Sequence, residues 1–384
     1  MVTNKEQNKL NVPHLRFPEF HGEWCVSTIG EQFDLYSGNT PSRLNKEHFE
    51  GNVNWITSGE LKEHYISDTK EKISEDAATA NNLKLLHPGT FVIAIYGLEA
   101  DGVRGTGSIT CKESTISQAC MAFTQKGDVK NEFLYSWYKK HGNIIGIKYA
   151  QGTKQQNLSY DILEKFHIAY PSQDEQDKLI KFISLLDERI ASQSKLIEKL
   201  ESLIKGLRVS LMQIENGNIV HLGEIAQIYQ PQTISSTELT EDGFLVYGAN
   251  GIIGKYKQYN HKTEQICITC RGNTCGMVNY TKPMSWITGN AMVINTDEHQ
   301  NKVCKRYLYH YLSAYNFNSI ISGSGQPQIV RTPLEQLKVP LPTFLEQKQK
   351  ATFLDKIQGK IEISNKTLDL YLQQKQYLLR LMFI

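Results

Sequence analysis

Residues 173–212 read QDEQDKLIKFISLLDERIASQSKLIEKLESLIKGLRVSLM, and this stretch decides the fold of the chain. It contains no proline, and its apolar residues recur with heptad spacing. The first seam position is filled by Ile183, Ile190, Ile197, Ile204 and Leu211. The second is filled by Leu179, Leu186, Leu200 and Leu207, with Gln193 as its one polar member. The pattern predicts a long helix that pairs with another helix.

A second stretch, residues 343–382, repeats this pattern. Its first seam position is filled by Leu354, Ile361, Leu368 and Met382, and its second by Ile357, Tyr371 and Leu378, with Ser364 in register with Gln193. A simple amphipathic helix packed on its own lobe is the alternative interpretation. Such a helix drifts by about 20° per heptad and would not keep so strict a repeat. We therefore expect the two helices to form a coiled coil.

The segments that precede the two helices are also copies of one another. Residues 116–123 (ISQACMAF) align with residues 287–294 (ITGNAMVI) at an offset of 171. The same offset carries Leu163, Phe166, Pro171, Glu175, Gln176 and Phe182 onto Leu334, Leu337, Pro342, Glu346, Gln347 and Phe353. Upstream, residues 91–97 (FVIAIYG) match residues 266–272 (ICITCRG), and residues 28–31 match residues 221–224, at larger offsets. The repetition indicates a tandem duplication whose loops differ in length.

Each copy has the composition of a mixed lobe. Short runs of Val, Ile, Phe and Tyr between turn residues predict strands, for example over residues 90–96 and 265–269. Residues 131–141 and 304–315 predict short helices. We expect an α+β fold with lobe one at residues 1–172, a first long helix at 173–214, lobe two at 215–342 and a second long helix at 343–384.

The chain path constrains how the two helices pair. The first helix leads from lobe one to lobe two and the second leaves lobe two, so a pair would be antiparallel, with a pseudo-two-fold relation between the lobes. A helix of this length spans roughly 60 Å at 1.5 Å per residue. Such a spacer suits a ligand with two half-sites, and duplex DNA is the obvious candidate.

Composition limits the class of protein. The chain has a net charge of +2, with 40% hydrophobic and 10% aromatic residues, which is typical of a folded soluble protein. Residues 24–172 hold 15 Lys and Arg against 17 Asp and Glu, and residues 220–340 hold 10 against 8. Neither lobe is a basic block, so a DNA contact has to come from a local patch. Seven irregularly spaced cysteines, a polar start and the lack of a long apolar run predict a cytoplasmic protein.

Several short stretches around the predicted strands and turns are similar to those of a known family. In lobe one they are residues 13–20 (PHLRFPEF) followed by Trp24, residues 37–42 (SGNTPS) and residues 55–61 (WITSGEL). In lobe two they are residues 246–254 (VYGANGIIG), 271–273 (RGN) and 323–328 (GSGQPQ). In this order, around duplicated long helices, they resemble the specificity subunits of type I restriction-modification systems over nearly the whole chain. Two places depart from the pattern: lobe two has residues 230–233 (QPQT) in place of GNTPS, and lobe one has residues 151–157 (QGTKQQN) in place of GSGQPQ.

The resemblance implies a non-catalytic DNA-binding subunit that serves phage defence. Each lobe would be a target-recognition domain that reads one half of a bipartite double-stranded DNA target, and the helices would set the gap. The helices would also dock two modification subunits, which carry S-adenosylmethionine and methylate adenine N6. Restriction subunits would join them to translocate and cut DNA with ATP and magnesium. The chain itself is expected to bind no cofactor and no membrane.

The sequence contains no catalytic signature that argues for another role. It lacks an Asn-Pro-Pro-aromatic run, an Asp-Pro-Pro-Tyr run and a GxGxxG. Residues 248–256 (GANGIIGKY) have the wrong spacing for a phosphate loop, and a glycine-rich turn is the expectation there. Cys267 and Cys270 form a CxxC without a second ligand pair, so we expect small buried residues on a strand and not a zinc site. Residues 346–348 (EQK) lie at a helix start and are not interpreted as a nuclease motif.

Base-edge readers are expected among polar side chains on loops near glycines. Arginine or lysine suits guanine O6 and N7, and asparagine or glutamine suits adenine N6 and N7. In lobe one the candidates are Arg43, Thr57, Ser58, Arg104, Lys154, Gln155, Gln156 and Asn157. In lobe two they are Tyr247, Asn250, Lys255, Arg271, Asn273, Gln326, Gln328 and Arg331. An ordinary solvated loop residue is the alternative for each single member; Arg104, Arg271 and Arg331 are singled out.

Two other functions stay open on these grounds. One is a methyltransferase or nuclease fused to recognition lobes, which the missing cofactor and metal motifs argue against. The other is a coiled-coil scaffold whose lobes bind carbohydrate or protein, which predicts no DNA affinity and no salt dependence of binding.

Overall fold

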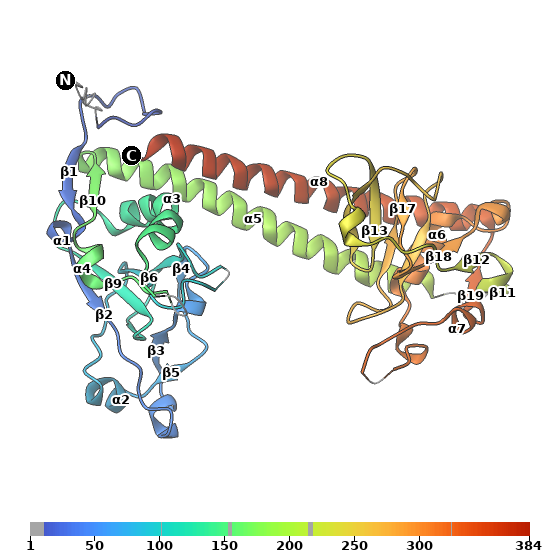
Figure 1. Ribbon diagram of the computed structural model, residues 1–384, viewed down its shortest axis with the longest axis horizontal. Coiled ribbons are helices and arrows are strands. Elements are labelled where there is room, and N and C mark those ends of the chain that lie inside the picture. The colour runs from blue at the N-terminus through green and yellow to red at the C-terminus, as the bar shows by residue number, and fades with distance from the viewer. Residues whose placement is uncertain (1–10, 101, 153–155, 214–217, 324) are drawn as a thin grey trace. The chain divides into compact units, whose positions relative to one another are not determined.

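The computed structural model of the chain describes residues 11–100, 102–152, 156–213, 218–323 and 325–384. They form two compact units: unit 1 contains Met1–Ser192 and Leu368–Ile384, and unit 2 contains Gln193–Thr367. The long helices α5 (Gln173–Met212) and α8 (Phe344–Met382) each contribute to both units (Figure 1). A unit is therefore one lobe together with a stretch of each helix.

Lobe one is built on a five-stranded sheet in the order β2-β9-β6-β7-β4. These strands are β2 (Phe33–Ser37), β9 (Cys120–Gln125), β6 (Phe91–Ala94), β7 (Gly107–Thr110) and β4 (Tyr65–Ile66). A three-stranded sheet combines β5 (Lys72–Ile73), β3 (Val53–Ile56) and β8 (Ser114–Ile116), and β1 (Cys25–Thr28) pairs with β10 (His167–Tyr170). The helices of the lobe are α1 (Ile29–Gln32), α2 (Glu75–Ala80), α3 (Asn131–Tyr149) and α4 (Tyr160–Leu163), with 3-10 turns at Lys46–Phe49 and Ser58–Glu60.

Lobe two has a four-stranded sheet in the order β12-β18-β15-β16. These strands are β12 (Gln227–Tyr229), β18 (Ala291–Asn295), β15 (Ile266–Thr269) and β16 (Val278–Tyr280). The second sheet combines β14 (Gly251–Tyr256), β13 (Phe244–Gly248) and β17 (Trp286–Ile287), and β11 (Asn218–His221) pairs with β19 (Lys338–Leu341). The helices are α6 (Lys305–Ala314) and α7 (Arg331–Glu335), with 3-10 turns at Leu222–Glu224, Ser236–Glu238, Asp297–His299 and Phe317–Ser319.

The duplication seen in the sequence is confirmed by the topology. In each main sheet the repeated segment forms the strand next to the first one, β9 in lobe one and β18 in lobe two. Each second sheet contains a parallel pair, β3 with β8 and β13 with β17. Equivalent hydrogen bonds follow these pairs: Ser117 N donates to Ile56 O at 2.9 Å, and Thr288 N donates to Tyr247 O at 3.0 Å. The expected helix over residues 131–141 is wrong at its end, because α3 continues through Gly142 and Gly146 to Tyr149.

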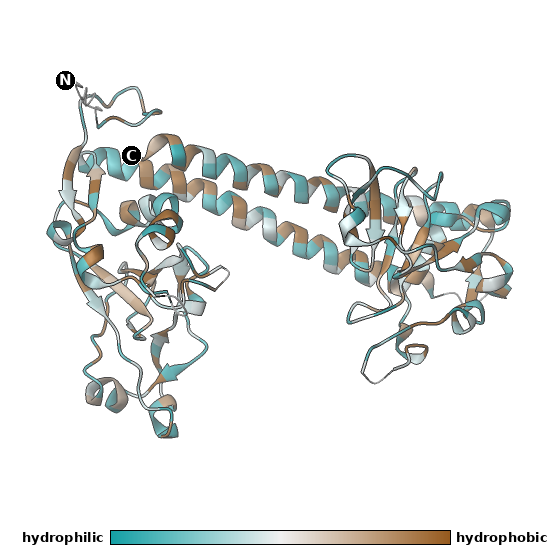
Figure 2. Cartoon of the chain, viewed as in Figure 1, coloured by the Kyte–Doolittle hydropathy of each residue, from teal (hydrophilic) through white to brown (hydrophobic). Residues whose placement is uncertain are grey.

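Helices α5 and α8 run antiparallel in each unit, as the heptads predict. Every seam residue named from the sequence is buried or half-buried. In unit 2 the two polar seam members meet, since Gln193 Nε2 donates to Ser364 O at 3.0 Å. In unit 1 the cation of Lys375, which occupies a seam position, pairs with Asp187. Figure 2 shows apolar residues recurring along both helices with hydrophilic residues between them.

A buried glutamine ties the start of each long helix to its lobe. Gln176 Oε1 accepts from Lys130 N at 2.9 Å, and its Nε2 donates to the carbonyls of Asp128 and Pro171, both at 3.1 Å. Gln347 repeats this arrangement with Cys304 N, Lys302 O and Pro342 O at 2.8–3.2 Å. Both side chains are essentially inaccessible to water. Because an unpaired buried amide is costly, these contacts determine where each lobe helix meets its long helix.

A buried histidine lies near each of these two junctions, and the charged groups around the two rings differ. His64 lies between Glu132 (Nε2, 2.8 Å) and Asp187 (Nδ1, 3.2 Å) and stacks on the rings of Tyr65 and Tyr135. Burial by itself lowers the pKa of His64, but the hydrogen bonds and charges of the two carboxylates outweigh burial and raise it above the usual value.

In lobe two a buried histidine of α6, His310, lies beside the long helices. Its Nε2 lies 2.8 Å from Asp355, and its Nδ1 accepts from Arg208 at 3.2 Å. Burial lowers the pKa of His310, and the cation of Arg208 acts in the same direction against Asp355. A guanidinium has no acceptor, so the ring nitrogen that faces it has to be unprotonated. The two carboxylates thus favour the protonated form of His64, whereas the contact with Arg208 requires a neutral ring at His310.

We expect the stability of unit 1 to depend on pH through His64. A group whose pKa is raised on folding contributes stability that is complete below its unfolded pKa, about 6.5, and is lost as the pH rises through the folded value. H64F keeps a ring between the two tyrosines and removes the charge. It should lower the free energy of unfolding by on the order of 1–3 kcal/mol at pH 5.5 and by less at pH 8.5, measured by urea unfolding.

The control for this experiment is H87F, because the side chain of His87 is 84% exposed and its ion pair with Glu113 is 3.7 Å long. The loss of stability in H87F should be small at both pH values. An H64F deficit that stays constant from pH 5.5 to 8.5 would contradict the proposed charge state of His64.

Candidate nucleic-acid interface

Near the end of each lobe two described positions pair through their backbones. The described residues from one position to the other are named here the closing segment: 151, 152, 156 and 157 in lobe one, and 322, 323 and 325–328 in lobe two. Gln151 and Asn157 exchange backbone hydrogen bonds of 2.8 and 2.9 Å. Ser322 and Gln328 do the same at 2.9 and 2.8 Å. The paired positions correspond at the offset of 171. The two segments share little sequence, so the backbone arrangement is kept while the side chains differ.

The residue after each closing segment bonds to the residue that directly follows a central strand of the main sheet. Leu158 N donates to Ile95 O at 2.9 Å, and Ile329 N donates to Cys270 O at 3.0 Å. Because β6 and β15 lie inside their sheets, the segments are held by rigid elements and present variable side chains from a fixed frame.

In lobe one the closing segment brings Gln156 to Arg104. The guanidinium Nη2 donates to Gln156 Oε1 at 2.9 Å. The neighbouring carboxylate of Glu99 accepts from Gln156 N at 2.7 Å, and this hydrogen bond lowers the pKa of Glu99. Asn157, next in sequence, has a buried side-chain oxygen with no partner among the described residues. The predicted residues Arg104, Gln156 and Asn157 therefore lie together.

In lobe two the closing segment borders a hollow of about 340 Å³. Its lining includes Arg271, Gln328 and Arg331, three of the predicted residues, with Tyr229 and Gln230. Arg271 and Gln328 also face each other across an isolated backbone bridge. Arg271 has no ion pair with any described residue, whereas Arg331 Nε donates to Glu335 at 2.6 Å. The free cation of this hollow is thus that of Arg271.

Other predicted residues of lobe one use their polar groups in hydrogen bonds within the protein. Arg43 forms a bidentate pair with Glu71, at 2.7 and 2.8 Å. Thr57 closes the turn that begins at Ser58, because its N–H and hydroxyl both donate to Glu60 Oε2 at 2.9 Å. Lys154 and Gln155 lie outside the described residues.

The remaining predicted residues of lobe two are spread over separate loops. Tyr247 is buried, and its hydroxyl accepts from Lys282 N at 3.1 Å. Asn250 accepts from the hydroxyl of Thr274 at 2.5 Å, and Lys255 pairs with Asp242 at 3.3 Å. Asn273 and Gln326 are exposed on the loops that neighbour Arg271 and Gln328 in sequence.

The sequence did not single out Gln230 as a reader, although it lines the lobe-two hollow. Its Nε2 donates to Cys270 Sγ and to Gly289 O, both at 3.1 Å, which leaves Oε1 as a free acceptor. The available signal was its position, since Gln230 directly follows β12 and begins the stretch that replaces GNTPS.

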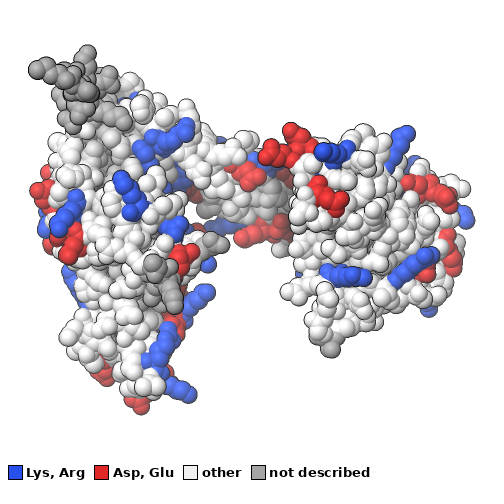
Figure 3. All heavy atoms as spheres, viewed as in Figure 1, with Lys and Arg blue, Asp and Glu red and all other residues white. Residues whose placement is uncertain are grey.

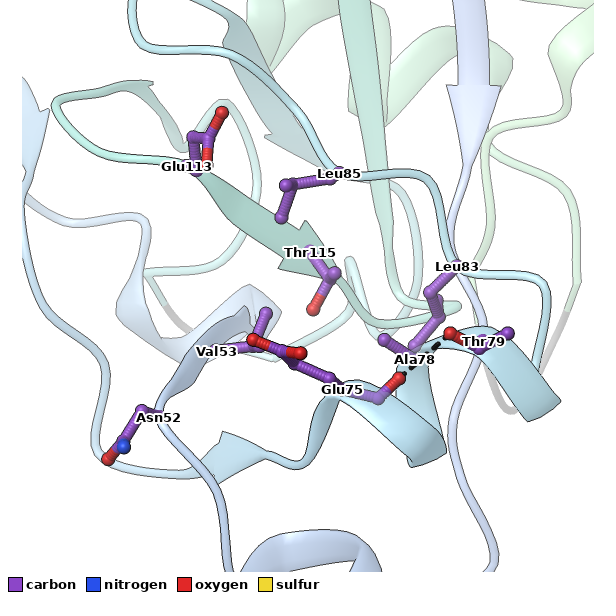
Figure 4. A pocket seen from close by; sticks show the side chains of 9 residues that line it. All are labelled: Asn52, Val53, Glu75, Ala78, Thr79, Leu83, Leu85, Glu113 and Thr115. Atoms are coloured by element: carbon purple, nitrogen blue, oxygen red, sulfur yellow. Dashed lines mark hydrogen bonds between the residues drawn. The ribbon is translucent and has the colours of Figure 1, made fainter.

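The distribution of surface charge agrees with DNA contact through local basic residues and not through the net charge of a lobe. On the face in Figure 3, lysine and arginine occur singly or in short rows in each unit, with acidic residues between them. A second hollow of about 370 Å³ lies in lobe one between α2, β3 and β8 (Figure 4). Its lining contains Glu75 and Glu113 and no basic residue, so it is unsuited to a phosphate backbone.

Comparison with known proteins decides the family. The family described as "Type I restriction modification DNA specificity domain" matches residues 21–202 and again residues 215–370. The chain belongs to this family. It is 25% identical to the EcoprrI specificity subunit of Escherichia coli over 87% of each chain, and 24% identical to the MjaVIII specificity subunit of Methanocaldococcus jannaschii over 94% of this chain and 92% of that one.

Solved structures show the same fold. The S subunit of the type I restriction-modification system from M. genitalium matches 97% of this chain and 99% of its own, with a TM-score of 0.65 at 20% identity. A chain from a study of type I complex assembly and conformational transition matches 93% of this chain and 96% of its own, with a TM-score of 0.55 at 16% identity. The expected α+β architecture with two recognition domains and long helices is confirmed.

Membership in the specificity family assigns the chain DNA recognition and not catalysis. The CxxC is consistent with this role, because Cys267 and Cys270 are buried and burial raises the pKa of the Cys267 thiol to about 12. Within the described ranges no three His, Cys, Asp or Glu side chains gather as a metal site, and no helix is long and apolar enough to span a membrane.

We expect Arg271 to contribute more to DNA binding by this specificity protein than Arg43 does. R271A should weaken binding by about ten- to a hundredfold and reduce the slope of log K against log salt by about 0.9 if the lost contact is a phosphate. R43A should change neither by more than a small factor, since the Arg43 fork is occupied by Glu71. Fluorescence anisotropy on labelled duplex DNA over a salt series measures both, and equal effects of the two variants would contradict this assignment.

Proposed function

We propose that this chain directs adenine N6 methylation and restriction by partner subunits to a split, asymmetric DNA target. The observation that carries the proposal is the pair of equivalent closing segments, which have the same backbone hydrogen bonds and different side chains. Equivalent frames present two reading surfaces, and different side chains make the two half-sites unlike. Arg104 and Gln156 serve lobe one, and Arg271 and Gln328 serve lobe two.

Two modification subunits dock on the long helices in this proposal. Besides the seam, the helices carry large apolar side chains that are about half exposed or more: Leu185, Leu370 and Tyr377 in unit 1, and Leu196, Leu203 and Ile363 in unit 2. Leu196 and Leu203 are seven residues apart, as are Leu370 and Tyr377. Exposed apolar residues at heptad spacing favour packing by further helices.

The partner subunits supply the chemistry. S-adenosylmethionine would be bound by the modification subunits, and ATP and magnesium by the restriction subunits, in the cytoplasm. The two other candidate functions have less support. A fused enzyme lacks a motif in the sequence, and a carbohydrate- or protein-binding scaffold does not explain two matches to a DNA specificity family.

The proposal is tested by methylation in a host that lacks adenine methylation of its own. Co-expression of the chain with modification subunits should produce N6-methyladenine at one split motif with a fixed gap, mapped by single-molecule sequencing. The chain alone and the modification subunits alone are the controls and should produce none. Methylation by either component alone, or an assembled complex that methylates no motif, would contradict the proposal.

The role of the helices in setting the gap leads to a separate expectation. One heptad inserted after Gln193 and one after Ser364 keeps the phase of both seams and lengthens each helix by about 10 Å, or roughly three base pairs. Both half-sites should stay the same while the gap grows by about that amount. Four residues inserted in α5 alone shift the seam and should disturb the target or the assembly. An unchanged gap in the double-heptad protein would show that the helices do not set it.

A further inference from the structure

In the Arg104–Gln156 pair the one side-chain acceptor, Gln156 Oε1, is engaged by the guanidinium, and the groups left without a partner among the described residues are donors. Arginine has no acceptor, so the group of Gln156 that faces Arg104 has to be its oxygen, and the amide nitrogen points elsewhere. The pair therefore offers the remaining N–H groups of the guanidinium and the two of the amide. Arg104 Nε is buried and has no partner among the described residues.

The position of Gln156 is fixed by two further contacts, both made by its backbone. Its N–H donates to Glu99 Oε2 at 2.7 Å, and its carbonyl accepts from Leu98 N at 3.1 Å. Together with the contact to Arg104, these leave the amide nitrogen as the group of Gln156 that has no partner among the described residues. A side chain held in this way loses little entropy when it meets a ligand.

The position of Arg104 is fixed by two glycines one turn apart on α3. A Cβ on Gly146 would lie 2.4 Å from Arg104 Cγ, and a Cβ on Gly142 would lie 3.0 Å from Gly105 Cα. The loop that carries Arg104 thus crosses α3 at a place where only glycine fits. Glycine inside a helix is destabilising by roughly 0.5–1 kcal/mol relative to alanine, so this close approach has a purpose beyond helix formation.

Lobe two has no side-chain amide at the corresponding place. Pro327 is the counterpart of Gln156 at the offset of 171, and its carbonyl accepts from Gly272 N at 3.0 Å, as that of Gln156 does from Leu98. Proline has no side-chain amide. The lobe-two hollow is lined by Gln328 and by Gln230, and the nitrogen of Gln230 is already used while its oxygen has no partner among the described residues.

We infer that Arg104 and Gln156 are specificity determinants that select guanine in the half-site read by lobe one. Guanine offers two acceptors, O6 and N7, in the major groove, whereas adenine and cytosine offer an amino donor that would meet a donor here, and thymine offers one acceptor beside a methyl group. Donors that match both guanine acceptors favour guanine over another base by about ten- to a hundredfold in affinity. The inference rests on the proposed function and assigns a base preference to one lobe.

The test exchanges one donor for an acceptor. In Q156E an oxygen still faces Arg104, and the amide nitrogen becomes a second oxygen. The complex with modification subunits is assayed with competitor duplexes that carry each base at each position of the wild-type motif. In Q156E and in R104A, the preference for one guanine in one half-site should fall at least tenfold. The other half-site should be unchanged, and R271A should affect that other half instead.

The matched control is Q118E, in lobe one but outside the closing segment, because Gln118 is exposed. It should keep the wild-type preference at every position, and recovery of intact complex by gel filtration shows that each variant folds. Unchanged discrimination in both Q156E and R104A, or a change in the half-site that R271A also alters, would overturn the inference. In those cases the wild-type split motif would still stand, whereas a wild-type complex without a split motif would refute the proposed function itself.

Discussion

The buried glutamine at the head of each long helix is the contact on which the rest of the structure depends. Gln176 and Gln347 satisfy their amides with backbone groups of the lobe and of the turn that leads into the helix. An amide buried so fully has few acceptable geometries. When all hydrogen bonds of the glutamine amide are made, the lobe helix contacts the long helix at one position only. The seam residues that follow along the long helix can then pack in a single register.

The two lobes share this backbone arrangement but differ in the charged and polar side chains around it. His64 lies between two carboxylates and His310 between a carboxylate and an arginine, so the surroundings favour the imidazolium at His64 and the neutral ring at His310. The reading surfaces differ in the same manner, with donors at Gln156 and an acceptor at Gln230. Duplication supplies equal geometry, and the choice of a few polar side chains makes its two halves unlike.

The fold was largely predictable, and the site was predictable only in part. Apolar residues at every seventh position and repeats at one offset indicated the helix pair and the two lobes. Of the candidate readers, Arg104, Gln156, Arg271 and Gln328 lie at the closing segments. Sequence could not show that Arg43 is occupied by Glu71 or that Tyr247 is buried, because both facts depend on distant residues. Lys375 was also missed, since a charge in a seam is recognisable only beside Asp187.

The sequence by itself determined the secondary structure of the long helices, their pairing and the duplication, because heptad spacing and repetition are local properties that can be counted along the chain. Only the tertiary structure decided which polar groups are free to meet a ligand. Gln156 and Gln230 are the same amino acid, yet one presents its nitrogen and the other its oxygen. That difference arises from partners tens of residues away, and a hydrogen bond already made inside the protein removes a group from recognition.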